Sequence, residues 1–192
     1  CYGDGGAVLS KDARLHDLLV SLRVHGQAVK SDLEGRTFDH DPKYLNMRIG
    51  MNARMDTIQA AVLLQKLAIF ADEIEARNRV ADRYAQGLGD VVRTPAVIDG
   101  GISVWAQYTI EIDDRDGLAA HLKAAEIPTA VYYPIPIHKQ GVYSVYPVGP
   151  GSLPATMAAA ERVISLPMHP YLEADVQDQI IAAIRAFAGR NA

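Results

Sequence analysis

The stretch RIGMNARMDTIQAA, residues 48–61, decides the fold, because a polar, glycine-bearing loop passes there into the longest helical pattern of the chain. Asp56, followed three residues later by Gln59, predicts a capping box at the start of that helix. A loop that ends at a helix start favours an anion, since free N–H groups and the helix dipole both attract negative charge. Asn52 can donate an amide hydrogen bond there, and Arg54 can donate a fork of hydrogen bonds to a carboxylate or a phosphate. On local chemistry alone, Asn52 could equally shape a turn and Arg54 could be a solvated surface charge.

The composition is that of a globular protein of one or two domains. The 192 residues are 49% hydrophobic and 22% charged, and the net charge of -4 does not indicate a basic surface that would bind nucleic acid. No apolar run approaches the ~20 residues that span a membrane, and no signal peptide opens the chain. The single cysteine, Cys1, excludes an internal disulfide and fits a reducing compartment. We therefore expect a cytoplasmic protein with neither a nucleic-acid nor a membrane partner.

The region before residue 48 contains a predicted strand and a predicted helix, followed by a segment without a regular apolar pattern. The apolar run at residues 7–9 predicts a strand, and Asp12 starts a predicted helix that Gly26 would cap at its C-terminal end. Residues 27–47 show no clean period and carry several acidic residues, so we expect a loop that is among the most mobile parts of the chain. The sequence Asp-His-Asp at residues 39–41 has no partner His or Cys at ligand spacing, and no metal site is predicted.

The region after Asp56 predicts a long helix and then a small domain of strands and helices. A bend is possible in the helix at residues 71–72, and Pro and Gly residues punctuate its end. The further predicted elements are a strand with period-two alternation over residues 104–112, a helix over 118–125, a strand over 129–133, a helix over 154–164, and a last helix with Val176, Ile180, Ile181, Ile184 and Phe187 facing inward. We expect an α+β domain with a mainly antiparallel sheet under helices.

A second group of candidate site residues lies where the strand predicted over 129–133 passes into a proline-rich segment. Tyr132, Tyr133 and His138 carry hydroxyl and imidazole groups that can bind sugar hydroxyls or a diphosphate. The alternative is a buried aromatic pair and a loop histidine with one hydrogen bond. Residue types alone do not decide between these interpretations.

The sequence resembles the DegT/DnrJ/EryC1/StrS family of sugar aminotransferases, which use pyridoxal phosphate (PLP). Residues 50–61 match the family signature G-x-N-x-R-x-x-x-x-Q-A-A. Further blocks match in family order over nearly the whole chain: CYGDGGA at 1–7, RVHG at 23–26, WAQYT at 105–109, YYPIPIH at 132–138 and SLPMHP at 165–170. The resemblance is strongest to the branch that aminates a UDP-linked 3-keto-hexuronic acid.

The resemblance implies an α/β fold of the fold-type I PLP transferases. It implies that residues 1–70 are the C-terminal part of the large PLP-binding domain and residues 71–192 the small C-terminal domain. In the family, the lysine that bonds PLP lies a few residues before the position of Cys1, and none of the six lysines here sits in that motif. We therefore expect the C-terminal portion of a longer enzyme, with no catalytic residue of its own and inactive alone.

The resemblance also implies roles for the candidate residues. The Asn at the position of Asn52 reaches the PLP phosphate of the neighbouring subunit, so a homodimer with shared active sites is expected. Arg54 matches a position that faces the sugar nucleotide in the uronate branch, where its fork suits a hexuronate carboxylate. Tyr132, Tyr133 and His138 belong to a block that is expected to bind substrate.

The implied reaction is transfer of an amino group, with glutamate as the expected donor, to C3 of a UDP-linked 3-keto-hexuronic acid for a cell-surface polysaccharide. An aminotransferase acting on a neutral nucleotide keto-sugar is an alternative within the family. A PLP sugar dehydratase, in which His replaces the lysine, is a second alternative. A non-catalytic binding or regulatory protein of the same fold is a third.

Overall fold

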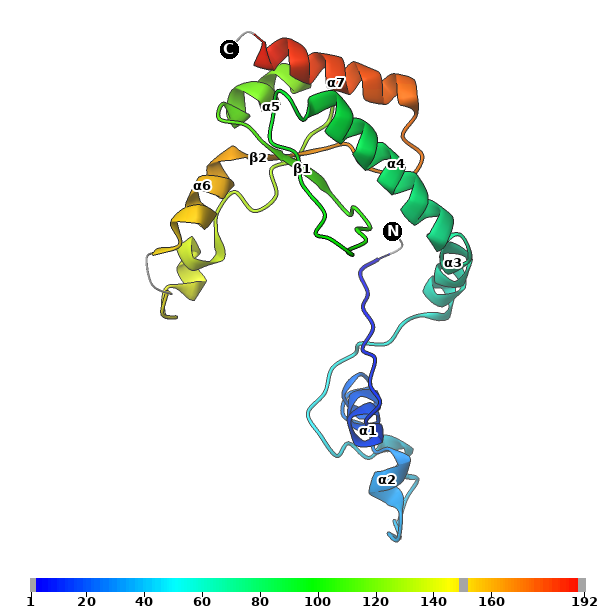
Figure 1. Ribbon diagram of the computed structural model, residues 1–192. Coiled ribbons are helices and arrows are strands. Elements are labelled where there is room, and N and C mark those ends of the chain that lie inside the picture. The colour runs from blue at the N-terminus through cyan, green and yellow to red at the C-terminus, as the bar shows by residue number, and fades with distance from the viewer. Residues whose placement is uncertain (1–2, 149–151, 190–192) are drawn as a thin grey trace. The chain divides into compact units, whose positions relative to one another are not determined.

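The computed structural model describes residues 3–148 and 152–189, and the chain divides into two compact units, Cys1–Ala68 and Ile69–Ala192 (Figure 1). The first unit contains mainly helices and connecting segments, whereas the second builds a sheet under helices. Each unit is described in turn.

Helix α1 of the first unit (Ala13–Leu22) begins where the sequence predicts. The carboxylate of Asp12 caps it by accepting from two backbone N–H groups of the first turn. The helix ends at Leu22, so the prediction that Gly26 is its C-cap is wrong. Gly26 instead adopts a φ of +78°, and its N–H donates to the Ser21 carbonyl at 2.9 Å, which turns the chain back after the helix.

Residues 27–47 are more ordered than the predicted loop. They contain the short helix α2 (Lys30–Leu33) and the 3₁₀ turn η1 (Pro42–Tyr44), and an isolated β-bridge pairs Gln27 with Asn46. Elements of four and three residues are too short to show an apolar period, which is why the sequence pattern did not reveal them.

The strand predicted at residues 7–9 is absent from the described structure. A strand is completed only by a partner that satisfies its backbone N–H and C=O groups. No residue in the described parts of the chain pairs with this run, so its apolar pattern does not produce a ladder.

Helix α3 (Thr57–Ala68) begins directly after Asp56, as predicted. The Asp56 N–H donates to Gln59 Oε1 at 3.2 Å, which is the Gln59 half of the predicted capping box. The helical pattern resumes in the second unit as α4 (Phe70–Leu88). The break falls at Ile69, which has a φ of -108° and a ψ of 5°, slightly before the predicted bend at residues 71–72.

The sheet of the second unit is antiparallel, as predicted. Strand β1 (Tyr108–Glu111) pairs with β2 (Val163–Leu166), and the first residue of β1 lies opposite the last residue of β2. Isolated bridges add Arg93 beside β1 and Ala130 beside β2. Buried and half-buried residues alternate along β1, which confirms the period-two pattern over this part of the prediction.

Strand β1 is shorter than the predicted strand over 104–112, and Trp105 supplies the physical reason. Its φ of +45° lies in the left-handed region, which a ladder cannot continue. The residue is fixed there by helix α4, because Arg77 Nη1 donates to the Trp105 carbonyl at 2.9 Å and the indole Nε1–H donates to Asn78 Oδ1 at 2.9 Å.

The predictions on either side of β2 need correction. The strand predicted over 129–133 is a single bridge at Ala130, and the helix predicted over 154–164 ends two residues early as α6 (Pro154–Arg162). Strand β2 then starts at the very next residue, Val163, with no connecting residue. It was missed because its short run of apolar residues and one serine continues the apolar pattern of the helix.

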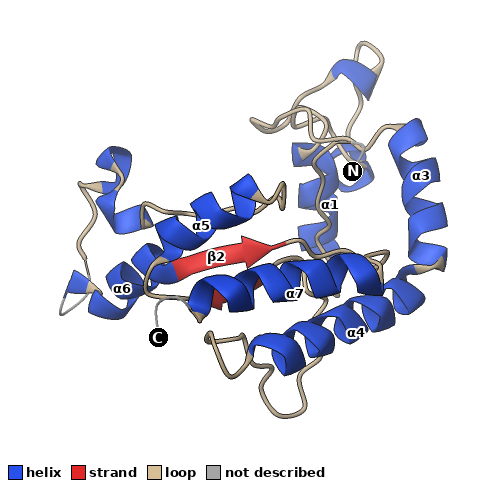
Figure 2. Ribbon diagram, turned by 90° about the horizontal axis from the view of Figure 1, so that it is seen from above, coloured by secondary structure: helices blue, strands red, loops and turns tan. Residues whose placement is uncertain are grey.

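Helices α4, α5 (Arg115–Ala124) and α7 (Ala174–Ala188) cover the sheet, and α7 packs against both of the others (Figures 1 and 2). The inward face of α7 was predicted correctly at Ile180, Ile184 and Phe187, but Val176 is 43% exposed. The side chain of Gln177 is buried instead, and its Nε2 donates to the Val80 carbonyl of α4 at 2.7 Å. Other buried core residues include Tyr84, Leu88, Tyr108, Ile110, Leu118, Leu122, Ile164 and Leu166.

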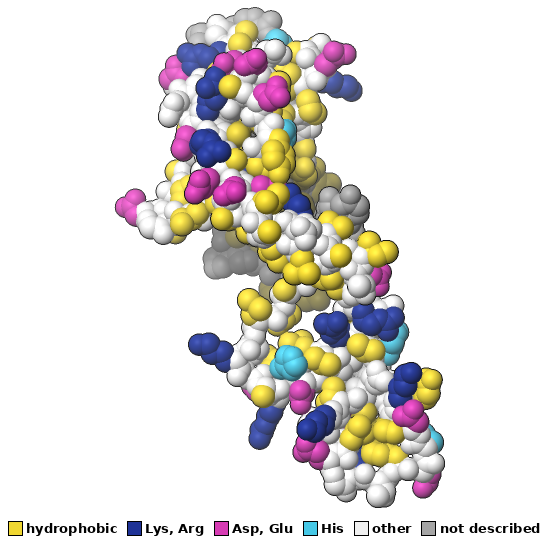
Figure 3. Space-filling view, turned by 90° about the vertical axis from the view of Figure 1, so that its right-hand side faces the viewer, with side chains coloured by type: hydrophobic (Ala, Val, Ile, Leu, Met, Phe, Trp, Pro, Cys, Tyr) yellow, Lys and Arg dark blue, Asp and Glu magenta, His cyan; other side chains and the backbone are white. Residues whose placement is uncertain are grey.

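The first unit has no comparable core. Within residues 3–68, only Ser21 and Gly26 are buried, while Ile49 is 99% exposed. Exposed apolar side chains are visible as yellow atoms on the face drawn in Figure 3. No helix in residues 3–148 and 152–189 is long and apolar enough to span a membrane.

Candidate functional site

The loop at residues 48–56 is held by the end of helix α1. The Met51 N–H donates to the Leu22 carbonyl at 2.9 Å, the His25 N–H donates to the Met51 carbonyl at 3.0 Å, and an isolated bridge pairs Asn52 with Val24. These bonds fix the backbone on either side of Asn52, so the loop has a defined conformation before helix α3 begins.

Two glycines allow the close approach on which this arrangement depends. A Cβ atom at Gly50 would lie 2.3 Å from the Gly26 nitrogen and 2.5 Å from the Leu22 carbonyl oxygen. A Cβ atom at Gly26 would lie 1.8 Å from the Arg48 carbonyl oxygen. Backbone therefore lies directly against backbone, and no larger residue fits at either position without moving the loop.

Arg48, at the start of the loop, makes a forked ion pair. Its Nη1 and Nη2 atoms donate to the two carboxylate oxygens of Asp32, each at 2.7 Å, and Nη1 also lies 3.1 Å from Ser21 Oγ. The Arg48 hydrogen bonds, assisted by the Val29 N–H at 3.0 Å, lower the pKa of Asp32 to about 2. The Asp32 carboxylate is therefore ionised throughout the neutral range.

Asn52 and Arg54, the predicted cofactor and substrate residues, lie on the exposed side of this fixed loop. Neither side chain has a hydrogen bond or ion pair with any residue that the structure describes. Arg54 is followed closely by the N-terminus of α3 at Thr57, so an amide, a guanidinium and a helix start follow one another within a few residues. This set of donors can bind an anionic group.

Tyr132 and Tyr133 lie side by side in the second unit, with ring centroids 6.3 Å apart. They are exposed, Tyr133 at 80%, so they are not the buried aromatic pair of the alternative interpretation. Tyr133 also has a φ of +58°, an uncommon backbone conformation for an aromatic residue. Such conformations cost energy and are found where the surrounding structure enforces them.

His138 lies in the 3₁₀ turn η2 (Ile137–Lys139), a few residues beyond the tyrosines. Its Nε2 atom is buried and has no hydrogen-bond partner among the described residues. The alternative interpretation, a loop histidine satisfied by one hydrogen bond, therefore fails at Nε2. A buried nitrogen without a partner is costly, which makes it a candidate for a bond to a ligand.

The remaining predicted assignments concern lysines and metals. All six lysines are exposed, as expected for solvated surface residues. No group of His, Cys, Asp and Glu that could hold a metal ion occurs in residues 3–148 and 152–189. Asn52 and Arg54 belong to the first unit, whereas Tyr132, Tyr133 and His138 belong to the second.

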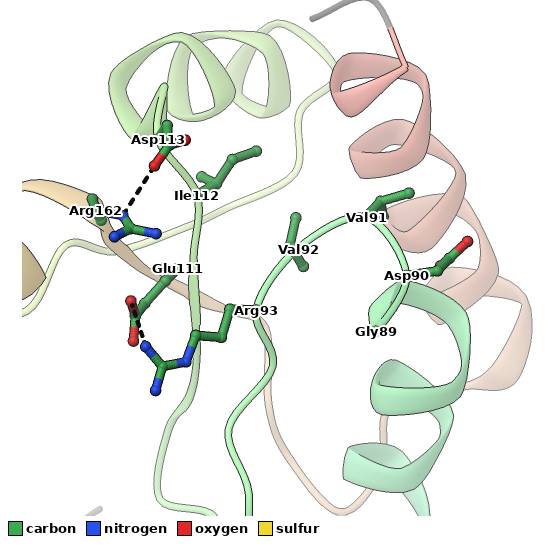
Figure 4. A pocket seen from close by; sticks show the side chains of 9 residues that line it. All are labelled: Gly89, Asp90, Val91, Val92, Arg93, Glu111, Ile112, Asp113 and Arg162. Atoms are coloured by element: carbon green, nitrogen blue, oxygen red, sulfur yellow. Dashed lines mark hydrogen bonds and ion pairs between the residues drawn. The ribbon is translucent and has the colours of Figure 1, made fainter. Parts of the chain in front are cut away.

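A separate hollow of about 360 Å³ lies in the second unit, and no predicted site residue lines it. Four of its charged side chains pair with one another (Figure 4): Arg93 Nη1 lies 3.5 Å from Glu111 Oε2, and Arg162 Nε lies 3.1 Å from Asp113 Oδ1. The Arg162 Nε–H is nevertheless without an acceptor in a hydrogen-bonding direction among the described residues. The third carboxylate that lines the hollow, Asp90, pairs with Arg185, which does not line it, so each charged side chain of the hollow already lies beside an opposite charge.

Sequence reasoning missed the residues that support the loop. Arg48 opens the stretch at residues 48–61 but had been given no role, and Gly26 ends the RVHG block but had been given only the role of a helix C-cap. Asp32 gave no signal, because it lies 16 residues from Arg48 in a segment without periodicity. Ser21 was also hidden, since a serine in an amphipathic helix is usually exposed and this one is 1% exposed.

The chain is similar to known proteins over nearly its whole length. Residues 1–185 match the sequence profile of the DegT/DnrJ/EryC1/StrS aminotransferase family. The chain is 43% identical over 185 residues to the UDP-2-acetamido-2-deoxy-3-oxo-D-glucuronate aminotransferase of Pseudomonas aeruginosa, a match covering 96% of this chain and 47% of the relative.

Solved structures agree with this similarity. A DegT/DnrJ/EryC1/StrS aminotransferase from Brucella abortus is 51% identical with a TM-score of 0.88, and the match covers 98% of this chain and 48% of that one. S. venezuelae DesV is 34% identical with a TM-score of 0.85, again over 98% of this chain and 48% of that one. The chain thus spans about half the length of the relatives it matches.

Proposed function

The chain belongs to the DegT/DnrJ/EryC1/StrS aminotransferase family, and from this premise we propose that the whole protein transfers an amino group to C3 of a UDP-linked 3-keto-hexuronic acid. The observation that carries the proposal is the loop at residues 48–56, which is hydrogen-bonded to the end of α1 and presents Asn52 and Arg54 with no internal partner among the described residues. The similarity to an aminotransferase named for a 3-oxo-glucuronate supports the choice of substrate.

The cofactor of the proposed reaction is PLP, and the donors at the loop fit its phosphate group. The Asn52 amide can donate a hydrogen bond, and the helix dipole at the N-terminus of α3 attracts negative charge. When bound, PLP supplies the electron sink that lets an amino group be exchanged. We assign the lysine that bonds PLP to a part of the whole protein outside residues 1–192, since none of the six lysines here lies in the family's lysine motif.

Arg54 is assigned to the substrate. A hexuronate differs from the neutral hexose by one carboxylate, and a guanidinium binds a carboxylate through two parallel hydrogen bonds. Tyr132, Tyr133 and His138 are assigned to the sugar hydroxyls and the diphosphate. The unsatisfied Nε2 of His138 supports that assignment, because a hydrogen bond to the substrate would satisfy it.

The proposed setting is a homodimer whose active sites are shared, with Asn52 reaching the cofactor of the neighbouring subunit. Glutamate is the proposed amino donor, and the product feeds a cell-surface polysaccharide. We place the reaction in the cytoplasm, a reducing compartment that suits a chain with one cysteine. Mixing Asn52→Ala subunits with subunits that lack the PLP lysine tests the sharing. Shared sites predict recovered activity, and heterodimers without recovery would contradict it.

The substrate is tested by measuring kcat/KM with a UDP-linked keto-uronate and with its neutral counterpart. Arg54→Ala should reduce kcat/KM for the uronate by ten- to a hundredfold, since a charge-assisted hydrogen bond contributes about 1.5–3 kcal/mol. The neutral substrate should be affected far less. Arg54→Lys should recover part of the loss, because it keeps the charge without the fork. Arg14→Ala, which removes another exposed arginine of the first unit, is the matched control.

The outcomes separate the alternatives. Equal loss on both substrates would assign Arg54 to the nucleotide, the cofactor or the loop, and would favour a neutral keto-sugar. A dehydrated sugar in place of an aminated one, identified by mass, would indicate the dehydratase. Absence of turnover by a protein loaded with PLP would favour a non-catalytic role.

A further inference from the structure

The segment at residues 27–47 is tied to the site loop at its two ends. The Met47 N–H and the Arg48 N–H both donate to the Gly26 carbonyl, at 2.8 and 3.2 Å. The Ala28 N–H donates to the Leu45 carbonyl at 2.8 Å. The segment therefore leaves the body of the unit at Gly26 and returns to the same point at Arg48, directly before the loop that carries Asn52.

The Arg48 side chain joins three parts of the first unit at the point where the segment returns to Gly26. Its guanidinium binds Asp32 of helix α2 through both nitrogens and binds Ser21 of helix α1 through one of them. The Ser21 hydroxyl in turn donates to the Gln27 carbonyl at 2.6 Å. Side-chain exposure is only 29% for Arg48 and 12% for Asp32, so water screens this pair less than an exposed one.

The geometry of Asp32 shows that the pair is fixed from both sides. One carboxylate oxygen accepts from Arg48 Nη1 and from the Val29 N–H, and the other accepts from Arg48 Nη2. Every hydrogen bond in this group has a defined donor, and the carboxylate has no freedom to rotate without losing two of them. Such a pair defines a position more than it adds to stability.

We propose that Arg48 and Asp32 are positioning residues, which hold the loop so that Asn52 meets the cofactor phosphate without touching cofactor or substrate themselves. This inference rests on the function proposed above. Gly26 and Gly50 let the backbone after α1 lie directly against the backbone of the site loop. The Arg48–Asp32 ion pair, here called the clamp, sets the position along α1 at which the two backbones meet. Asp32 is thereby a functional residue in a segment that shows no site motif.

The test measures binding of two probes by the whole protein, PLP and pyridoxal, which lacks the phosphate. Asp32→Asn should weaken PLP binding about tenfold, within the coupling range of residues in one network, and leave pyridoxal binding almost unchanged. Arg48→Lys should weaken it less, because charge is kept and the fork is lost. Asp90→Asn is the matched control, since Asp90 makes the same forked pair with Arg185, at 2.6 and 2.8 Å, in the second unit. It should not change the affinity for PLP.

A double variant separates positioning from general stability. If Asp32 acts through Asn52, then Asp32→Asn should cost nothing further when Asn52→Ala is already present, and additive losses would overturn the proposal. Hydrogen exchange gives an independent readout, because Asp32→Asn should speed exchange of the Met51 N–H while exchange in the second unit stays unchanged.

Failure of the two proposals can be told apart. If Asn52→Ala leaves PLP affinity intact, the cofactor assignment fails. If Asn52→Ala weakens PLP binding but Asp32→Asn does not, the assignment stands and the clamp is wrong.

Discussion

The two units of this chain reach defined structures by different physical means. The second buries an apolar core between β1, β2 and helices α4, α5 and α7. Within residues 3–68, the first unit buries no apolar side chain and is held by backbone hydrogen bonds, two glycines and a forked ion pair. The contrast teaches that the loop at residues 48–56 is set by contacts of fixed geometry, whereas the sheet and helices of the second unit are set by packing.

The largest expected effect lies in the packed unit. Ile184 of helix α7 is fully buried, so Ile184→Ala should lower the free energy of unfolding by about 2–5 kcal/mol through lost burial and a residual cavity. Val176→Ala, on the same helix at an exposed position, should change it by less than about 0.5 kcal/mol. Urea unfolding of the whole protein measures both. Equal effects would mean that α7 does not rely on its buried face.

A glycine substitution tests the first unit. Gly50→Ala places a Cβ atom against backbone at 2.3 Å, so the loop must move, and PLP affinity should fall by about tenfold or more. Gly6→Ala is the control in the same unit, because a Cβ there meets nothing within 4 Å. Equal PLP affinities for the two variants would show that the close approach of the backbones does not position Asn52.

Acid should titrate paired carboxylates of both units, whereas alkali should titrate buried tyrosines of the second unit. The pKa of Asp32 is lowered from 3.8 to about 2, so its contribution to stability is complete above about pH 4 and is lost as the pH falls through 2. Burial raises the pKa of Tyr108 from 10.0 to about 12, so its contribution is complete below pH 10 and is lost as the pH rises through 12.

Urea midpoints recorded from about pH 2 to about pH 12 test this contrast. Asp32→Asn should reduce the acid sensitivity only, and Tyr108→Phe the alkaline sensitivity only. If either variant altered the opposite side of the profile, the assignment of the two titrations to Asp32 and Tyr108 would be wrong.

The smallest expected effect concerns hydrogen exchange within residues 27–47. The sequence predicts mobility throughout. The structure refines this prediction, because the N–H groups of Ala28 and Val29 are bonded, to the Leu45 carbonyl and to Asp32, whereas residues 37–41 are mostly exposed. We expect slow exchange near the two ends and fast exchange over 37–41. Uniform exchange along the segment would contradict the anchoring of its ends.

Much of the fold could be predicted from sequence because the signals are local. Asp12 and Gln59 mark helix starts by their side-chain chemistry, and the alternation along β1 follows from one covered face. Strand β2 could not be found this way, since β1 lies about 55 residues away and only the fold brings the two strands together.

The candidate site divides in the same manner. Asn52 and Arg54 could be selected from their place before a helix, supported by the family signature. The Asp32 partner of Arg48 could not, because an ion pair between distant residues leaves no periodic trace. The left-handed backbone conformation of Tyr133 could not be predicted either, since nothing in its residue type favours a φ of +58°.

The junction between α6 and β2 has a mechanical consequence. Because Arg162 is the last helical residue and Val163 the first strand residue, the chain has no slack at this joint. Unwinding one helical residue into extended backbone would lengthen the chain by roughly 1.8 Å, and a slip of β2 by one residue against β1 would reverse the faces on which its side chains lie. No connecting residue is therefore present to absorb a displacement of α6 before it reaches the β1–β2 ladder.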